Sequence, residues 1–297
     1  MNQPNRLSRR AATKGIVTST AAAMLTQTMA FSDDPPSKAK SGKSQTGSSA
    51  RTKVTPRRLI TKKGICGKGT RCETTGAGWY YNWYWRPTPG QLDAEFVPMI
   101  KGKKDAIDRA FAHLETLKES HGVTHLLGFN EPDSESQGNT TVDKAVQLWP
   151  KLMDTGLRLG SPAVTDNRRG KDWFAAFMEQ AAAKRFRIDF ITVHRYPNIK
   201  GPQSVKLFFH SLQQIYQKYR LPIWVTEFSG LNFGSKDRKM TAATNLWFMK
   251  QTLPALNQLP YIERYAWYSG GAKDISHMYD RDHPDQLNQL GKFYRTV

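Results

Sequence analysis

The sequence predicts an α/β protein with a single (β/α)8 barrel domain, and three observations support this. From about residue 59 onward, eight short β-rich runs follow one another, and amphipathic helical stretches separate most of them. No Gly-rich nucleotide-binding loop follows any of these runs, which argues against a doubly wound sheet. The 297 residues also have room for one such barrel, which needs roughly 250.

The elements are expected where the apolar pattern has a period of two for strands or of about 3.6 for helices. The expected strands are residues 63–68, 78–85, 95–100, 124–130, 157–164, 189–196, 223–228 and 264–269. The expected helices are residues 103–120, 141–153, 172–184, 203–219 and 241–257. Thr141 is expected to open the second helix and Asp172 to cap the third, and no convincing helix separates the first two strands.

Residues 1–58 are expected to precede the domain, which spans residues 59–297. Arg9 and Arg10, followed by a weakly apolar stretch up to Ala30, resemble a twin-arginine export signal, so residues 1–30 are interpreted as a signal peptide. Residues 31–58 are rich in Ser, Lys, Gly and Pro and are interpreted as a disordered linker. We therefore expect an exported protein, periplasmic or extracellular. A disordered basic tail is the alternative for the first residues.

The formal charge of +19 at first suggests a polyanionic partner such as nucleic acid. Residues 1–63, however, contain 13 Lys and Arg against 2 Asp and Glu, so more than half of the excess lies in these residues, most of it in the leader and linker. We therefore expect no nucleic acid partner, although a polyanion-binding protein remains an alternative that depends on charge alone. After residue 30 no stretch is long and apolar enough to span a membrane.

Two cysteines occur, Cys66 and Cys72, and neither has a partner Cys or His at zinc-ligand spacing. No metal site and no cofactor are predicted. In an oxidising compartment the two cysteines could bridge a short loop, and two separate thiols are an equal alternative.

Two glutamates lie at the ends of apolar strands. Glu131 follows the fourth run and precedes Pro132, which has no N–H to donate to a strand ladder. Glu227 lies near the end of the seventh run. Because functional residues of a (β/α)8 barrel gather at the carboxyl ends of the strands, the two side chains are expected to face each other across the barrel mouth.

A facing pair of carboxyls is what hydrolysis of a glycosidic bond needs. One carboxyl donates a proton to the leaving oxygen, and the other attacks or stabilises the anomeric carbon. A separation of about 5–5.5 Å retains the anomeric configuration, whereas about 6.5–9.5 Å inverts it. A single strand-end Glu is more often a cap or a surface ion, so the hypothesis depends on the pair.

Six segments together resemble glycoside hydrolase family 128. They are AEFVPM at 94–99, GFNEPD at 128–133, GSPAV at 160–164, DFITVHRYP at 189–197, IWVTEF at 223–228 and AWYS at 266–269. The resemblance covers about residues 60–295 and implies a retaining β-1,3-glucanase barrel. It also implies Glu131 as acid/base, Glu227 as nucleophile and Asn130 as the partner of the sugar's 2-hydroxyl. The chain departs from the family at residues 100–102, where members often have Trp-Gly.

The sixth run places Thr192, His194 and Tyr196 on one face, and Ile191 and Val193 on the other. The polar face is expected to point to the barrel axis and the aliphatic face to the helices. Tyr196 is then a candidate donor to Glu227. His194 is expected to line the sugar subsite, with a satisfied core histidine as the alternative.

Aromatic residues are candidates for stacking on a sugar ring. Trp267, near the end of the eighth run, is expected to be the sugar platform at the cleavage point. Asn82 and Trp83 are expected to extend this floor, although alternate residues of one strand cannot all face the cleft. Trp224 has the opposite parity to Glu227 and is expected to pack in the core.

The expected function is hydrolysis of β-1,3-glucan by a monomeric retaining glycoside hydrolase, with a β-glucan polysaccharide or oligosaccharide as its partner. Besides the polyanion-binding protein, two alternatives remain open: a non-catalytic glucan-binding protein on the same barrel, and a β-glycanase of different linkage specificity. Binding to insoluble glucan without any product would favour the first.

Overall fold

The computed structural model describes residues 61–297 apart from residues 103, 232–239 and 272–273, and it leaves out the side chains of residues 104–107. The chain divides into two units, Met1–Thr55 and Pro56–Val297, and every described residue belongs to the second. The predicted signal peptide and linker lie outside the described residues.

Eight parallel strands form a closed barrel. Six of them make one sheet in the order β3-β2-β1-β8-β7-β6, and β4 pairs with β5. Parallel bridges from Met99 to Leu127 and from Gly160 to Phe190 join the two sheets at both edges, so the predicted (β/α)8 barrel is confirmed. The strands are β1 Lys63–Cys66, β2 Trp79–Tyr81, β3 Glu95–Phe96, β4 His125–Leu126, β5 Arg158–Leu159, β6 Ile191–Arg195, β7 Ile223–Phe228 and β8 Ile262–Trp267.

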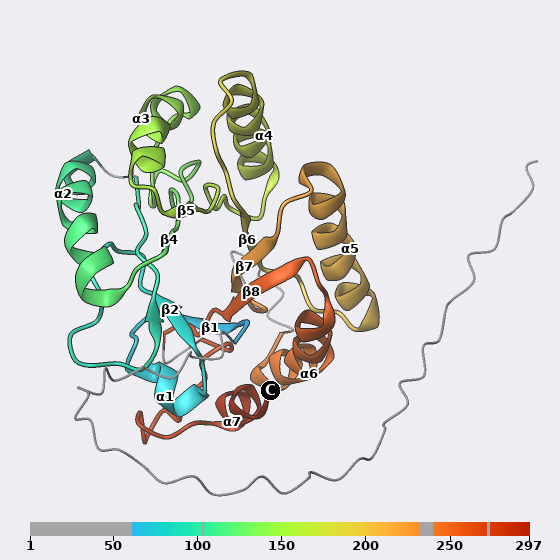
Figure 1. Cartoon of the computed structure of the whole chain (residues 1–297). Coiled ribbons are helices and arrows are strands. Elements are labelled where there is room, and N and C mark those ends of the chain that lie inside the picture. Colours follow the sequence, from blue (N-terminus) through green and yellow to red (C-terminus); the bar gives the residue numbers. More distant parts are fainter. Residues whose placement is uncertain (1–60, 103, 232–239, 272–273) are drawn as a thin grey trace, which may run out of the picture. The chain divides into compact units, whose positions relative to one another are not determined.

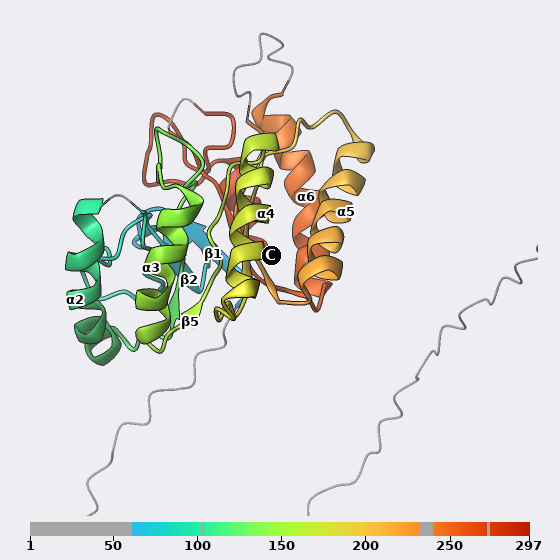
Figure 2. The same cartoon turned by 90° about the horizontal axis from the view of Figure 1, so that it is seen from above.

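Helices α2 to α6 follow one another around the outside of the strands (Figure 1), and α2, α3 and α4 lie side by side along the barrel (Figure 2). None of the described helices is long and apolar enough to cross a membrane. The helices are α1 Arg71–Thr75, α2 Lys104–His121, α3 Val142–Asp154, α4 Arg168–Ala183, α5 Pro202–Tyr219, α6 Ala242–Gln258 and α7 Gln289–Thr296.

All eight strands lie at predicted runs, but most are shorter than predicted. The second strand ends at Tyr81, because the chain turns at Trp83, whose φ of 58° lies in the left-handed region and cannot continue a strand. The eighth begins two residues earlier than predicted, at Ile262, and ends at Trp267.

The helix ends follow side-chain capping. Thr141 caps α3, as predicted, and accepts from the backbone N of Lys144 at 3.2 Å. The prediction of Asp172 as a cap is wrong, because Asn167 accepts from Gly170 N and starts α4 a turn earlier. Asp172 instead pairs with Arg168 within the first turns of that helix. The short helices α1 and α7 were not predicted.

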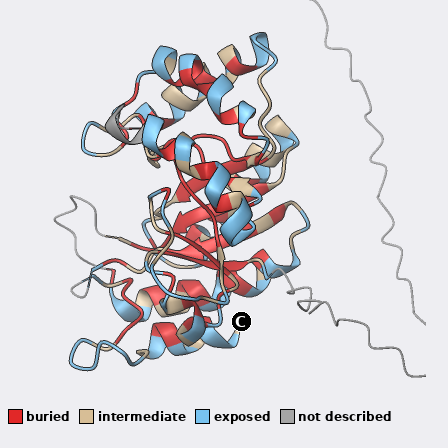
Figure 3. Cartoon of the chain, turned by 60° about the vertical axis from the view of Figure 1, so that its left-hand side comes forward, coloured by how far each residue is buried: buried red, intermediate tan, exposed pale blue. Residues whose placement is uncertain are grey.

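The strands separate two apolar layers, because alternate side chains point to opposite faces of a sheet. The outward layer packs against the helices, and Figure 3 shows buried strands beneath helices that expose their outer faces. Gly64 gives the inner layer room, since a Cβ there would lie 2.1 Å from the Trp79 ring. The inner layer consists of Cys66, Trp79, Tyr81, Val97, Met99, Leu127, Phe190, Trp224 and Ala266.

A buried arginine occupies the barrel interior near the amino ends of the strands. Arg264 is 1% exposed, and its Cζ lies 4.3 Å from the centroid of the Trp224 ring. Its Nη2 donates to Glu95 Oε2 at 2.8 Å, and His125 Nδ1 lies 3.3 Å from Glu95 Oε1. Burial would raise the pKa of Glu95, but the hydrogen bonds and charges of His125 and Arg264 outweigh it and lower the pKa.

Cys66 and Cys72 are both buried and form no disulfide. The Sγ of Cys66 lies 3.2 Å from the carbonyl oxygen of Trp267, and that of Cys72 lies 3.6 Å from the carbonyl oxygen of Trp79. Of the two alternatives left open by the sequence, the structure therefore contains two separate thiols.

Replacing Arg264 with Met is expected to lower the free energy of unfolding by about 3 kcal/mol at pH 7, because it leaves the Glu95 charge without its buried partner. The pKa of Glu95 in the folded state lies below its usual 4.5. The pair's contribution is therefore present above about pH 4.5 and is lost as the pH falls through the lowered pKa. Urea denaturation at pH 7 and pH 3 tests this. The variant's deficit should shrink at pH 3, and an equal deficit at both values would contradict the ion-pair explanation.

Candidate active site

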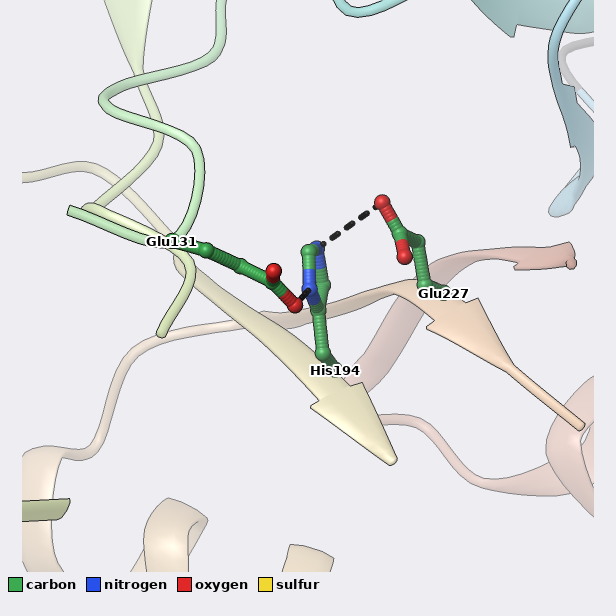
Figure 4. A group of neighbouring side chains, drawn as sticks. All are labelled: Glu131, His194 and Glu227. Atoms are coloured by element: carbon green, nitrogen blue, oxygen red, sulfur yellow. Dashed lines mark hydrogen bonds and ion pairs between the residues drawn. The ribbon is translucent and has the colours of Figure 1, made fainter. Parts of the chain in front are cut away.

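Glu131 follows β4 at the rim where the carboxyl ends of the strands meet. Its φ of 41° lies in the left-handed region, which costs a residue with a long side chain of order 1–3 kcal/mol. Its backbone N donates to Ala163 O at 2.6 Å, and its carbonyl accepts from Ser134 N at 2.9 Å and from Gly138 N at 3.3 Å. These bonds hold the strained backbone, and the side chain points toward His194 (Figure 4).

Glu227 lies on β7 and is 4% exposed. Three side chains donate to its carboxyl. Tyr81 OH and Trp83 Nε1 donate to Oε1 at 2.9 and 2.7 Å, and Tyr196 OH donates to Oε2. Three donors fix the carboxyl in one orientation.

The side chain of His194 lies between the two carboxyls and is completely buried (Figure 4). Its Nδ1 lies 3.0 Å from Glu131 Oε1, and its Nε2 lies 3.4 Å from Glu227 Oε1. One oxygen of each carboxyl and one ring nitrogen all lie within 4.8 Å of one another. The two glutamates predicted to face each other across the barrel mouth are thus brought together.

The two carboxyls change the acidity of their neighbours. Burial alone would lower the pKa of His194, but the charge of Glu227 and the hydrogen bond and charge of Glu131 outweigh it and raise the pKa above its usual 6.5. Burial and the Glu227 charge raise the pKa of Tyr81 and Tyr196 well above 10. Burial, and after it the Glu227 charge, raises the pKa of Tyr268 to about 12. The three phenols therefore keep their protons at neutral pH.

The orientation predicted for the sixth strand is confirmed. Ile191 and Val193 belong to the outer layer against the helices, while Thr192 bonds to Ser161 and His194 reaches the glutamates. Tyr196 donates to Glu227, as the sequence indicated.

The residues predicted to line the sugar-binding surface lie in different environments. Trp83 is at the site and donates to Glu227. Asn82 is engaged within its own loop, since its Nδ2 donates to Arg86 O at 2.9 Å and its Oδ1 accepts from Tyr84 N at 3.2 Å. Asn130, beside Glu131, is 2% exposed, and its Oδ1 has no hydrogen-bond partner among the described residues.

The prediction of Trp267 as the sugar platform is wrong, because its side chain is 0% exposed. It packs against Phe228 in the outer layer, and its Nε1 donates to Ser276 O. The parity of β8 explains this: Ala266 belongs to the inner layer, so Trp267 points to the helices. Tyr268, the next residue, lies beside Trp83 with ring centroids 6.2 Å apart.

Sequence reasoning missed Tyr81 and Tyr268 as members of the site. The period-2 pattern contains a signal for the first, since Trp79, Tyr81 and Trp83 alternate along one run. Tyr268 lies two residues after Ala266 and therefore on the same face of the chain. It can be assigned to the site once Ala266 is known to point inward.

Glu131, His194 and Glu227 are also the one group of His, Cys, Asp and Glu side chains in the described part of the chain with the spacing to hold a metal ion. Nδ1 of His194 hydrogen-bonds Glu131, and Nε2, which has no hydrogen-bond partner among the described residues, lies 3.4 Å from Glu227 Oε1. This arrangement can hold, give and accept protons and can present one carboxylate as a nucleophile.

Comparison with known proteins agrees with this geometry. Residues 67–294 match the family described as glycosyl hydrolase catalytic core. The alkali-sensitive linkage protein 1 of Schizosaccharomyces pombe is 28% identical over 204 residues, which are 65% of this chain and 34% of that protein. The chain thus spans about a third of that relative's length.

Solved structures match over most of the chain. A GH128 subgroup I endo-β-1,3-glucanase from Amycolatopsis mediterranei, in complex with laminaritriose, is 34% identical with a TM-score of 0.68, covering 80% of this chain and 99% of that one. A GH128 subgroup III curdlan-specific exo-β-1,3-glucanase from Blastomyces gilchristii is 29% identical with a TM-score of 0.62, covering 80% and 98%. The family match, the barrel and the facing carboxyls lead to one conclusion: the chain belongs to the glycosyl hydrolase catalytic core family and is a glycoside hydrolase related to the GH128 enzymes.

Proposed function

We propose that the protein is a retaining endo-β-1,3-glucanase in which Glu227 is the nucleophile and Glu131 the general acid/base. The separation of the two carboxyls supports this most directly, since one oxygen of each lies within 4.8 Å of the other. An approach of two carboxyl oxygens to within 4.8 Å favours the roughly 5–5.5 Å spacing of retaining enzymes. It falls short of the about 6.5–9.5 Å between the carboxyls of inverting enzymes, which must hold a water molecule.

The first step forms a covalent glycosyl-enzyme. An oxygen of Glu227 attacks the anomeric carbon, the glycosidic C–O bond breaks, and Glu131 gives its proton to the leaving oxygen. In the second step the Glu131 carboxylate takes a proton from water, the water oxygen attacks the anomeric carbon, and the ester bond to Glu227 breaks. Both glutamates then have their starting protonation states.

The surroundings of the glutamates support this division of roles. Glu227 accepts from three donors, which orient a carboxylate for attack. Glu131 has a single side-chain hydrogen-bond partner among the described residues, His194, and lies on a loop at the rim. A carboxyl that must alternate between acid and base is better served by few fixed donors.

The relatives support a β-1,3-glucan as substrate, because GH128 structures from three subgroups are described as β-1,3-glucanases. Endo action follows the subgroup I relative, which has the higher identity of the two described above. Asn130 is proposed to bond the sugar's 2-hydroxyl, because its Oδ1 is buried beside Glu131 with no partner among the described residues. Export through a twin-arginine signal remains part of the proposal, since it would place the enzyme with an extracellular polysaccharide.

Replacing Glu131 or Glu227 with Gln is expected to lower kcat on laminarin about 10³-fold or more, equivalent to about 4 kcal/mol of barrier. Reducing-end release from laminarin and curdlan measures this, with thermal unfolding to show that each variant folds. Wild-type activity in either folded variant would refute the roles. Binding of glucan by the wild type without any product would support a binding protein, and product from β-1,4-glucan would indicate another linkage.

The anomeric configuration of the first product is expected to be β. Proton NMR of a laminarihexaose digest in its first minutes distinguishes the β from the α anomer before mutarotation mixes them. An α product would mean inversion and would contradict the argument from carboxyl spacing.

Replacing Tyr196 with Phe is expected to lower kcat about 10- to 100-fold, because Glu227 loses one of three donors while Tyr81 and Trp83 remain. Tyr265→Phe is a matched control, since that buried hydroxyl donates to Asn257 on the outer side of the barrel. If both variants lost activity to the same degree, the Tyr196 bond would have no specific role in the reaction.

A further inference from the structure

His194 contacts the proposed acid/base more closely than the proposed nucleophile. Its Nδ1 lies 3.0 Å from Glu131 Oε1, whereas its Nε2 lies 3.4 Å from Glu227 Oε1. Glu227 has three other donors, but among the described residues His194 is the one side chain that hydrogen-bonds the Glu131 carboxyl. Loss of His194 would therefore leave Glu227 held and Glu131 unsupported.

The number of protons available to His194, Glu131 and Glu227 limits the protonation states that this geometry allows. Nε2 has no hydrogen-bond partner among the described residues, but it lies 3.4 Å from Glu227 Oε1, and an anionic carboxylate at that distance favours a proton on Nε2. The hydrogen bond between Nδ1 and Glu131 Oε1 then requires one further proton between the two atoms. It belongs either to Nδ1, with Glu131 as carboxylate, or to Glu131, with a neutral imidazole.

We propose that Glu131 and Nδ1 of His194 share this one proton, so that His194 is a positioning residue that keeps the acid/base loaded for the leaving group. The proposal depends on the function proposed above. It goes beyond that function, because it assigns the proton of the first step to a pair of side chains rather than to one glutamate.

The shared proton fits the two-step reaction without any other reagent. When the leaving oxygen takes the proton from Glu131, a carboxylate is left facing an unprotonated Nδ1, and this contact between two acceptors favours the return of a proton from the water of the second step. When Glu131 later takes a proton from the attacking water, the pair again contains one proton. The protons on Tyr81 and Tyr196 do not move, because those phenols remain donors to Glu227 throughout.

The charges around His194 favour keeping the shared proton. Burial opposes a charged ring, but the charge of Glu227 and the hydrogen bond and charge of Glu131 outweigh it and raise the pKa of His194. Titratable and charged groups lie around the ring on several elements: Glu131 after β4, Glu227 on β7, Asp166 after β5 and Tyr196 after β6, while Arg195 donates to the backbone carbonyl of His194. Arg195 is paired with Asp166, so the net local charge is negative.

Two substitutions separate the functions of the two ring nitrogens. His194→Asn places an amide nitrogen near the position of Nδ1 and keeps a donor for Glu131, whereas His194→Gln places one near Nε2 and keeps a donor for Glu227. Neither amide titrates. We expect kcat to fall about 10-fold in the Asn variant and about 100-fold in the Gln variant, within the range that general acid/base catalysis contributes.

The pH profile is the readout that a purely structural role would not change. In both variants the basic limb of kcat/KM is expected to move to lower pH by about one unit, because the second site for the proton is gone. His125→Asn is the matched control, since His125 also lies beside a carboxylate, Glu95, at the other end of the barrel. Its basic limb should remain at the wild-type position.

A second readout uses the leaving group. A dinitrophenyl β-laminaribioside needs little proton donation, so the variants' deficit in kcat/KM should largely disappear on it while remaining on laminarin. A basic limb that stays in place, or an equal deficit on both substrates, would overturn the proposal. A wild type with no activity on either substrate would instead overturn the proposed function.

Variants that fail to fold would not end the test, because the wild type can be titrated directly. In ¹⁵N-histidine NMR we expect the His194 ring to have a protonated Nε2 and an Nδ1 shift between those of a bare and a protonated nitrogen near neutral pH. A bare Nε2 at neutral pH would overturn the proposal. Glu131→Gln should change the Nδ1 signal and so assign it.

Discussion

The hydrogen bonds that converge on Glu227 are the constraint on which the site depends. They come from Tyr81 on β2, from Trp83 just after it and from Tyr196 just after β6. Because β2 lies three strands away from β7 in the sheet order, the phenol of Tyr81 must reach through the barrel interior to arrive at the carboxyl. The position of this one side chain therefore requires the closed barrel. A flat sheet with the same sequence could not bring these donors to it.

Hydrogen bonds also explain why strained backbone is tolerated at the rim. Trp83 has a φ of 58° and Glu131 a φ of 41°, values that long or bulky side chains rarely adopt. Trp83 gains a 2.7 Å hydrogen bond to a buried carboxylate, and Glu131 is held by backbone bonds to the loop after β5 and within its own loop. Bonds to an ionised group are worth about 1.5–3 kcal/mol, which is enough to offset the strain at Trp83.

Much of the fold and half of the site follow from local pattern. Eight apolar runs gave the strands, and a glutamate at the end of two of them gave the carboxyl pair. The parity of Ile191 and Val193 oriented His194 and Tyr196 correctly. The prediction for Trp267 is wrong because its place near a strand end does not say which face it lies on, and no local pattern shows that Ala266 rather than Trp267 points inward. Tyr81 was missed because its partner lies across the barrel, where local pattern carries no information.

The side-chain directions along β7 show most clearly which structural information a single sequence lacks. Trp224 and Glu227 are three residues apart, so a regular strand would point them to opposite faces, and the expectation that Trp224 packs in the core was based on this. The packing is as expected, but Trp224 lies in the inner layer, on the same side as Glu227. Register shifts between β6 and β7 and between β7 and β8 absorb the extra residue. The irregularity lets one strand fill the barrel interior with an indole and still place a carboxylate against His194. A bulge of this kind arises from pairing with neighbouring strands, so it cannot be predicted from the sequence of β7 alone.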